Sequence, residues 1–227
     1  MKLSVIIPVF NEARTIEQVI HQVAALPFEK EILVVDDGST DGTAEKLDAL
    51  RDGKVRVFRH PKNLGKGAAI RTALSEAKGE IILFQDADLE YDPSDYPILL
   101  EPIEKGIADV VYGTRLMGGR PQRVHFFWHK VGNNFLTLVT NVLYNTTLTD
   151  METGYKVFRR EILGSFPLRS NDFRIEPEVT VKVLKRKYRL YEVPIAYYGR
   201  SYAEGKKITW KDGFKALWVL LKYRFVD

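Results

Sequence analysis

The chain has 227 residues, contains no cysteine, and is 45% hydrophobic and 28% charged. This balance is typical of an ordinary soluble protein with a sizeable core, and the lack of cysteine excludes disulfides, thiolate zinc sites and a cysteine nucleophile. The formal net charge of +4 is too small to indicate a nucleic-acid partner by itself, and none is expected.

The first half of the chain alternates between the patterns of strands and helices. Nearly continuous apolar runs predict strands buried on both faces, and they lie at residues 3–9, 31–35, 55–58, 80–85 and 109–112. Helices are predicted between these strands, the first of them with Asn11 as its N-cap. They lie around residues 16–23, 43–50 and 66–78.

Short connections between alternating strands and helices predict an α/β fold with a parallel sheet. In such sheets, ligands bind at the carboxyl ends of the strands. Three polar clusters follow predicted strands, namely Asn11-Glu12, Asp36-Asp37 and Asp86-Ala87-Asp88. We therefore expect these clusters to share one edge of the sheet.

The strongest candidate for chemistry is the segment Phe84-Gln85-Asp86-Ala87-Asp88-Leu89-Glu90. Alternate residues of an extended segment point the same way. Asp86 and Asp88 can therefore reach one hard cation such as Mg²⁺ or Mn²⁺, with Glu90 next on that face. Asp-x-Asp is also a common loop pattern, but its position at the end of an apolar strand favours the metal site.

Two further loops have both a functional and a structural interpretation. In residues 36–42, Asp36 and Asp37 can accept hydrogen bonds from a ribose or base, whereas the remainder suits a turn and a helix start. Residues 62–67, Lys-Asn-Leu-Gly-Lys-Gly, can help to neutralise a diphosphate at a helix N-terminus. They lack the spacing of a P-loop, and a solvated loop is the competing interpretation.

The second half of the chain is less regular. Helices are predicted at 128–144 and 177–187, a strand at 189–198, and a last helix that opens at Thr209 with Asp212 as a capping partner. The last helix carries an aromatic and aliphatic face and nearby basic residues, which suits a membrane interface. This face would otherwise simply pack on the domain. The face comprises Phe214, Leu217, Trp218, Leu221 and Phe225.

Several classes of protein lack support in the sequence. No Gly-x-Gly-x-x-Gly follows the first strand, which disfavours a dinucleotide dehydrogenase, and Gly-x-Ser-x-Gly is absent, which disfavours an α/β-hydrolase. No segment approaches the length of a membrane span, and the N-terminal apolar run is too short for a signal peptide. The expected location is the cytoplasm, with peripheral attachment to the inner face of the membrane as a further expectation.

Four motifs in order resemble the nucleotide-binding half of glycosyltransferase family 2. They are residues 4–12 (SVIIPVFNE), 34–41 (VVDDGSTD), 63–67 (NLGKG) and 86–88 (DAD). Gly113-Thr114-Arg115 and residues 150–158 (DMETGYKVF) extend the similarity. Within the family, the sequence most resembles the dolichol- and polyprenyl-phosphate sugar transferases.

The resemblance implies a GT-A fold, which is a Rossmann-like, mostly parallel sheet with helices on both faces. It implies one domain comprising a nucleotide-sugar-binding half (1–115), an acceptor half (116–208) and a C-terminal amphipathic helix (209–227). Many relatives also carry C-terminal transmembrane helices, and this chain has none.

The same resemblance implies roles for individual residues. Asp88, Arg115 and Arg200 are expected to be catalytic, and the metal would be held by Asp86, Asp88 and Glu90. Arg115, Asn133 and Arg200 would face the acceptor. The stretch before the long helix departs from these relatives, which often have Arg and Ser there, because it contains Lys130 as its one firm positive charge. The donor would be held by Pro8, Val9, Asn11, Glu12, Asp37, Lys66, Asp86, Ala87 and Asp88.

The expected reaction is a metal-dependent, inverting transfer of a sugar from a GDP- or UDP-sugar to a polyprenyl or dolichyl phosphate. A phosphate acceptor needs no general base, because its second pKa of about 6 leaves it largely dianionic at neutral pH. A soluble or polysaccharide hydroxyl acceptor would need a base, such as Glu176 or Asp150. Two further functions stay open, namely a sugar-phosphate nucleotidyltransferase and a non-catalytic nucleotide-sugar-binding module.

Overall fold

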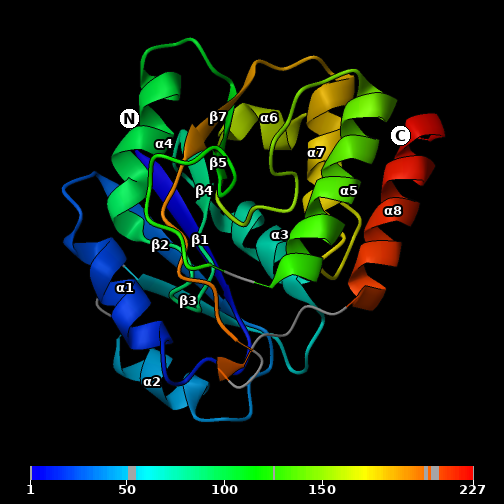
Figure 1. Cartoon of the computed structure of the whole chain (residues 1–227). Coiled ribbons are helices and arrows are strands. Elements are labelled where there is room, and N and C mark those ends of the chain that lie inside the picture. The colour runs from blue at the N-terminus through cyan, green and yellow to red at the C-terminus, as the bar shows by residue number, and fades with distance from the viewer. Residues whose placement is uncertain (1, 51–54, 125, 202–203, 206–209, 227) are drawn as a thin grey trace.

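The computed structural model describes residues 2–50, 55–124, 126–201, 204–205 and 210–226. A seven-stranded sheet with the order β3-β2-β1-β4-β6-β5-β7 forms its centre (Figure 1). All neighbouring strands are parallel except β6, which is antiparallel to both β4 and β5. The mostly parallel sheet is therefore confirmed. The strands are β1 (Leu3–Val9), β2 (Lys30–Asp36), β3 (Val55–Arg59), β4 (Ile81–Phe84), β5 (Val110–Thr114), β6 (Lys156–Arg159) and β7 (Leu190–Pro194).

Helices cover both faces of the sheet, as expected. One face packs against α1 (Ile16–Ala25), α2 (Thr43–Ala49) and α4 (Tyr96–Glu104), which the short 3₁₀ turn η1 (Pro93–Asp95) precedes. The other face packs against α3 (Lys66–Glu76), α6 (Arg160–Gly164) and α7 (Ile175–Lys185). Beyond α7 lie α5 (Phe127–Tyr144) and α8 (Trp210–Phe225), side by side (Figure 1).

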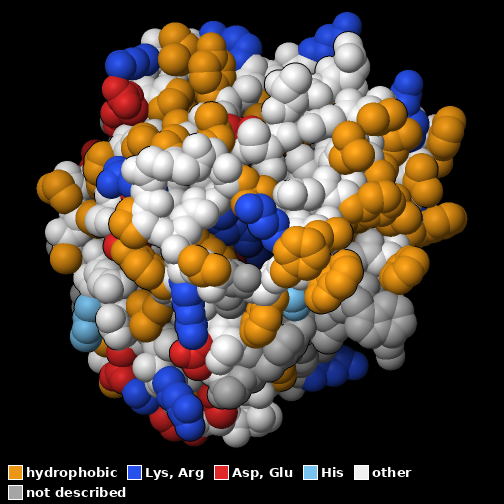
Figure 2. Space-filling view, in the orientation of Figure 1, with side chains coloured by type: hydrophobic (Ala, Val, Ile, Leu, Met, Phe, Trp, Pro, Cys, Tyr) orange, Lys and Arg blue, Asp and Glu red, His pale blue; other side chains and the backbone are white. Residues whose placement is uncertain are grey.

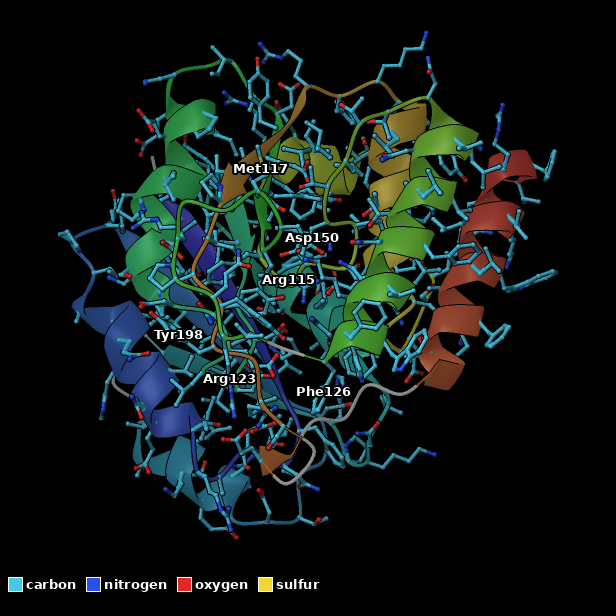
Figure 3. The ribbon with its side chains drawn as sticks, viewed as in Figure 1. Arg115, Met117, Arg123, Phe126, Asp150 and Tyr198 are labelled. Atoms are coloured by element: carbon cyan, nitrogen blue, oxygen red, sulfur yellow. The ribbon has the colours of Figure 1, made fainter. Side chains whose placement is uncertain are left out.

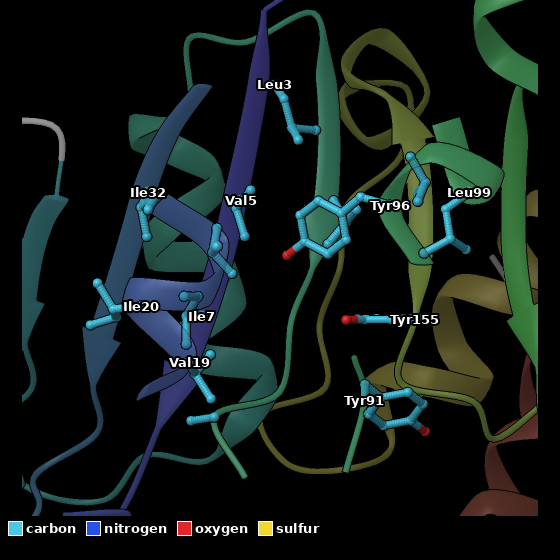
Figure 4. Close-up of a cluster of buried hydrophobic side chains, with 14 of the residues drawn as sticks. Leu3, Val5, Ile7, Val19, Ile20, Ile32, Tyr91, Tyr96, Leu99 and Tyr155 are labelled. Atoms are coloured by element: carbon cyan, nitrogen blue, oxygen red, sulfur yellow. The ribbon is translucent and has the colours of Figure 1, made fainter. Parts of the chain in front are cut away.

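The alternation of side chains along β1 explains its unbroken apolar sequence. Val5 and Ile7 point into the core that α1 covers, where they join Val19 and Ile20 (Figure 4). Ile6 points to the opposite face and joins the second core. Because both faces of the strand are buried, both sets of positions are apolar except Ser4, whose hydroxyl donates a hydrogen bond of 2.6 Å to Glu31.

Two strands differ from the prediction. β6 was not predicted, because Lys156 and Arg159 flank only two apolar residues, too few to indicate a strand. β7 ends at Pro194, earlier than predicted, because its partner strand β5 ends opposite it, at Thr114. The antiparallel direction of β6 places its beginning, rather than its end, at the edge where the parallel strands have their carboxyl ends.

The predicted N-cap of the first helix is wrong. The cap position of α1 is Thr15, which makes no side-chain cap hydrogen bond. Asn11 has a φ of 52° and instead binds the neighbouring loop, where its Oδ1 accepts a hydrogen bond of 2.8 Å from the Thr40 N–H. Asn11 therefore joins the loops after β1 and β2 rather than opening a helix.

The last helix has two apolar stripes, which the sequence did not separate. Its packed stripe joins Leu136 of α5 and Val181 of α7 and comprises Ala216, Val219, Leu220 and Tyr223. The stripe that the sequence singled out is mostly exposed and includes Phe214, Trp218, Leu221 and Phe225, whereas Leu217 is partly buried. For the exposed residues, the interpretation that they pack on the domain is wrong. The capping pair of Thr209 and Asp212 cannot be assessed, because Thr209 lies outside the described residues.

Candidate functional site

The predicted site residues lie at the carboxyl edge of the sheet, where the chain order switches between β1 and β4. The chain passes outward from β1 through β2 to β3 and then returns to β4 on the other side of β1. Such a switch point leaves a crevice between the loops that follow the two strands. Here these loops carry Asn11 and Glu12 after β1 and Asp86 and Asp88 after β4.

Gln85 fixes the start of the acidic loop. Its Oε1 accepts hydrogen bonds from the hydroxyls of Tyr96 at 2.9 Å and Tyr155 at 2.7 Å, and its Nε2 donates to the Asp86 carbonyl at 3.0 Å. Leu89, with a φ of 62°, turns the chain sharply after Asp88. The acidic loop is thus held rigidly at both ends, which suits a binding site.

Asp86 is paired with a buried lysine. The Lys66 Nζ lies 2.7 Å from Asp86 Oδ1 and 2.8 Å from Glu176 Oε1, and the Lys156 Nζ lies 2.6 Å from the other Glu176 oxygen. Burial alone would lower the pKa of Lys66, but the charges of Asp86 and Glu176 raise it above its ordinary value. Burial likewise opposes the effect of Lys156 and Lys66 on Glu176, yet its pKa is lowered. Glu176 is therefore poorly suited to act as a general base.

Asp88 and Glu12 share the guanidinium of Arg200. Arg200 Nη2 donates to Asp88 Oδ2 at 3.0 Å, and its Nη1 and Nη2 donate to the two Glu12 oxygens at 3.0 and 3.1 Å. Burial, together with the negative charges of Asp86 and Glu90, raises the pKa of Asp88 to about 7 against the lowering effect of Arg200. The structure thus brings Arg200 to two of the carboxylates predicted to bind the donor, and its predicted contact with an acceptor stays a prediction.

Glu90 is used to hold the segment after β7. One of its oxygens accepts a hydrogen bond from the Tyr197 hydroxyl at 2.8 Å, and the other accepts one from the Arg200 N–H at 2.6 Å. Within the described ranges, no three carboxylate or histidine groups are arranged to hold a metal ion. Each Glu90 oxygen thus already accepts one hydrogen bond, and as a third ligand Glu90 would have to use a remaining lone pair.

The carboxylates of Asp86 and Asp88 nevertheless fit a divalent cation. They supply the oxygen ligands that Mg²⁺ and Mn²⁺ prefer. Burial, followed by repulsion from Asp86 and Glu90, raises the pKa of Asp88, and a bound cation would stabilise its charged form. In this structure, Lys66 and Arg200 neutralise the two carboxylates.

The glycines of the loop before α3 permit a close contact between backbones. A Cβ at Gly65 would lie 2.4 Å from the Asn171 carbonyl oxygen, and one at Gly67 would lie 2.2 Å from that of Ser170. Asp37 fixes the same loop, since its carboxylate accepts hydrogen bonds from the N–H groups of Leu64 at 2.9 Å and Gly65 at 2.7 Å. The end of the loop at residues 65–67 is therefore packed, whereas residues 62–64 are exposed to solvent. The packed end directs Lys66 to Asp86.

The remaining predicted donor residues line the same edge. Val9 is buried at the end of β1, beside the partly buried Pro8, and the buried Ala87 accepts a hydrogen bond of 2.7 Å from the Thr15 hydroxyl. Asp37 is also buried and has the loop contacts described above. The structure places these residues together, and their contacts with a nucleotide stay predictions.

Arg115 forms a bidentate ion pair with a buried carboxylate. Its Nε lies 2.6 Å from Asp150 Oδ2 and its Nη2 lies 2.7 Å from Asp150 Oδ1. The Asn133 side-chain amide of α5 donates to Asp150 at 2.9 Å, so Arg115 and Asn133 bind the same carboxylate. Figure 3 shows Arg115 and Asp150 close together. Burial alone would raise the pKa of Asp150, but Arg115 lowers it below its usual range. Asp150 is thus also unsuited to be a general base.

One carboxylate near these groups was missed by the sequence analysis. Glu152 Oε1 is buried and accepts no hydrogen bond from any residue that the structure describes. Burial raises the pKa of Glu152 to about 7, against the lowering effect of Lys156. Its place between Asp150 and Gly154, inside a motif already singled out, was the available clue.

Comparison with protein families and curated proteins gives consistent matches. Residues 4–166 match the model described as glycosyl transferase family 2. A dolichol-phosphate mannosyltransferase of Pyrococcus furiosus is 31% identical over 212 residues, which cover 91% of this chain and 59% of that protein. An uncharacterized protein of Methanocaldococcus jannaschii is 30% identical over 227 residues, covering 97% of this chain and 91% of that protein. The chain therefore spans about three fifths of the mannosyltransferase but most of the second relative.

Solved structures show the same fold. Glucosyl-3-phosphoglycerate synthase from Mycobacterium tuberculosis, in complex with Mn²⁺, UDP-glucose and phosphoglyceric acid, matches with a TM-score of 0.77 and 22% sequence identity. The match covers 100% of this chain and 80% of that one. At this identity, the likeness is evidence for the fold.

Proposed function

The chain belongs to glycosyl transferase family 2 and has a GT-A fold, and from this premise we propose that it transfers a sugar from a nucleotide-sugar donor to a polyprenyl or dolichyl phosphate. The observation that carries the acceptor proposal is the position of Arg115. It is held rigidly by Asp150 and is linked through it to Asn133 on the first half of α5. That half of α5 exposes Phe127 and Trp128 to solvent. An arginine linked to a helix that exposes apolar side chains suits a ligand with a phosphate head and a lipid tail.

The donor would bind at the loops after β1, β2 and β4. Asp86 and Asp88 would hold the divalent cation, Mg²⁺ or Mn²⁺, with Glu90 the least suited of the three predicted ligands. When bound, this cation would offset the negative charge that develops on the leaving nucleoside diphosphate. Lys66 would add positive charge at the same place, because its ammonium already contacts Asp86.

The acceptor would be positioned by Arg115. Its Nη1 makes no hydrogen bond with the part of the chain that the structure describes, so it can donate to a phosphate while Nε and Nη2 stay on Asp150. The acceptor phosphate would attack the anomeric carbon and the nucleoside diphosphate would leave from the opposite face, which inverts the configuration. Arg200 would reach the acceptor only by exchanging its ion pairs with Glu12 and Asp88.

A nucleotide-release assay tests this proposal. Purified protein is mixed with GDP- and UDP-sugars, Mg²⁺ or Mn²⁺, and a short polyprenyl phosphate, and released nucleoside diphosphate is measured. The matched control is the unphosphorylated polyprenol of the same length. Release that depends on the phosphate supports the proposal, whereas equal release with the alcohol would indicate a hydroxyl acceptor. In a separate reaction supplied with a nucleoside triphosphate and a sugar 1-phosphate, release of pyrophosphate would indicate a nucleotidyltransferase. Donor binding without release in either reaction would indicate a binding module.

We further propose that the exposed faces of α5 and α8 lie on a membrane. Within the part of the chain that the structure describes, no helix is long and apolar enough to cross a bilayer. The two helices instead present one continuous apolar face, visible as neighbouring orange patches over α5 and α8 in Figure 2. This apolar face comprises Phe127, Trp128, Val131, Phe135, Leu138 and Val142 of α5, and Phe214, Trp218, Leu221 and Phe225 of α8.

The composition of the apolar face favours a lipid surface over a protein partner. Its two tryptophans are 77% and 62% exposed, and tryptophan prefers the boundary between lipid and water. Lys130, Lys222 and Arg224 are exposed on the same two helices and complement anionic headgroups. A membrane on this face would also bring a lipid-linked acceptor to the side of the site where Arg115 and Asn133 lie.

Substitution of the exposed tryptophans is expected to weaken membrane binding. In a flotation assay with vesicles containing anionic lipid, Trp128→Asp and Trp218→Asp should each reduce the bound fraction about tenfold, because each removes the burial of a large apolar side chain. Ile107→Asp is the matched control, since Ile107 is 44% exposed in the connection between α4 and β5, away from this face. Equal binding by all three folded variants would contradict the proposal.

A further inference from the structure

Glu152 lies on the segment that links the two sides of the proposed site. This segment precedes β6, and the antiparallel direction of β6 brings it to the carboxyl edge of the sheet. Two residues before Glu152, Asp150 holds Arg115. Two residues after it, Gly154 packs so closely on Asp86 that a Cβ there would lie 2.3 Å from Asp86 Oδ2. The backbone at Glu152 therefore lies between the residue that holds the proposed acceptor arginine and the residue packed on the proposed metal carboxylate. The charged groups that act on its carboxylate are Lys156, Glu176, Arg115 and Asp150.

The backbone around Glu152 is fixed, so its position is not that of a loose loop. The Thr153 hydroxyl donates to the Gly113 carbonyl, and the Gly154 N–H donates to the Tyr91 hydroxyl at 2.8 Å. On the other side, the Asp150 N–H donates to the Glu192 carboxylate at 3.1 Å. The segment is thus anchored before and after Glu152.

Glu152 differs from the neighbouring carboxylates because it forms no ion pair within the described part of the chain. Asp86, Asp88 and Asp150 each form an ion pair with a lysine or arginine. The nearby Lys156 is committed to Glu176 and the Thr153 carbonyl. Glu152 Oε1 remains buried without a hydrogen bond from any described residue. A buried acceptor without a donor costs free energy, so such a group calls for an explanation beyond folding.

A sugar supplies hydrogen-bond donors of the kind that Glu152 Oε1 lacks within the described structure. In a transfer from a nucleotide sugar, the sugar must lie between the diphosphate and the acceptor, which here means between Asp86 and Arg115. Sugar hydroxyls donate hydrogen bonds, and an ionised carboxylate accepts them through both oxygens. Burial raises the pKa of Glu152 and Lys156 offsets this only in part, which agrees with the lack of hydrogen-bond donors from the described residues at its buried oxygen.

We propose that the Glu152 carboxylate accepts hydrogen bonds from hydroxyl groups of the donor sugar and thereby helps to select which sugar is transferred. This inference rests on the proposed function and assigns a binding and selectivity role, in which Glu152 forms no covalent bond. A site that is built to pair with a hydroxyl discriminates strongly against an analogue that lacks it.

Calorimetric titration of wild type and Glu152→Gln tests the inference. Each protein is titrated with a nucleoside diphosphate and with the corresponding nucleotide sugar, from the UDP and GDP series, in the presence of Mn²⁺. We expect the affinity for the nucleoside diphosphate to stay within about twofold, while the affinity for the nucleotide sugar falls at least about tenfold, as for loss of a hydrogen bond to a charged group. Donors lacking one sugar hydroxyl should bind wild type more weakly but should lose little further affinity for Glu152→Gln.

A matched control and distinct outcomes keep the test decisive. Glu101→Gln removes an exposed carboxylate of α4 and should change neither affinity. A fall of both affinities by the same factor would assign Glu152 a structural role, and unchanged affinities would exclude sugar contact. Unchanged binding with slower transfer and the loss of an ionisation near pH 7 would make Glu152 a general base. Each of these three results overturns the inference, whereas a wild type that binds no nucleotide at all would overturn the proposed function itself.

Discussion

Replacing Asp86 by asparagine is expected to reduce nucleoside diphosphate release by about 10²–10³-fold, the usual cost of removing one group that stabilises charge in a transition state. The substitution keeps the shape of the side chain but removes the charge that faces Lys66 and the proposed cation. The apparent affinity for Mn²⁺ should fall in parallel. Release measured across a Mn²⁺ titration checks both effects.

Glu90→Gln is the comparison that separates ligands from structural carboxylates. A glutamine can still accept the hydrogen bond from the Tyr197 hydroxyl, so we expect less than a tenfold loss of release. If Glu90→Gln were as damaging as Asp86→Asn, Glu90 would be a metal ligand in addition to accepting the hydrogen bonds from Tyr197 and Arg200. Full release by Asp86→Asn would refute the metal site.

Replacing Arg115 by alanine is expected to destabilise the fold as well as to abolish transfer. The substitution leaves Asp150, whose side chain is 0% exposed, as a buried charge without its main partner. Breaking such a pair from one side costs about 3–5 kcal/mol in the free energy of unfolding. Urea denaturation measures this loss, and release with polyprenyl phosphate measures the loss of transfer.

A double variant distinguishes the two roles of Arg115. In Arg115→Ala/Asp150→Asn, the unpaired buried charge is gone and the Asn133 bond can persist, so most of the lost stability should return. Transfer should not return, because the group that would hold the acceptor phosphate is still missing. Recovery of transfer together with stability would show that Arg115 serves only the fold, and the proposed acceptor contact would then be wrong.

The apolar patterns in the sequence correctly predicted the central strands of the sheet and the edge at which the polar loops lie. β1, β2 and β4 are continuous apolar runs, and the sheet rule placed Glu12, Asp37 and Asp86 at one edge, where the structure has them. The ion pair between Lys66 and Glu176 could not be predicted from the sequence, because it is a tertiary contact between residues far apart in the chain. The sequence suggested a basic loop near a diphosphate but could not reveal that its lysine is buried between two carboxylates.

Other failures have their own physical reasons. The strand β6 is too short and too polar at its ends to have a clear period, so its antiparallel direction was not anticipated. In α8, apolar residues occur on two sides, and a helical period alone does not say which side meets the protein. Glu152 was missed because the lack of a partner can be seen only once every neighbour has been placed.

The close approach of Gly65 and Gly67 to the backbone at residues 170 and 171 restricts how this protein can be recombined with its relatives. This backbone contact joins the segments before and after residue 115, and it leaves no room for a methyl group at either glycine. A chimera that takes its first 115 residues from this chain needs a partner whose later loop follows the same path. If the later loop followed a different backbone path, this contact would be lost and Lys66 would no longer be held in position to bind Asp86.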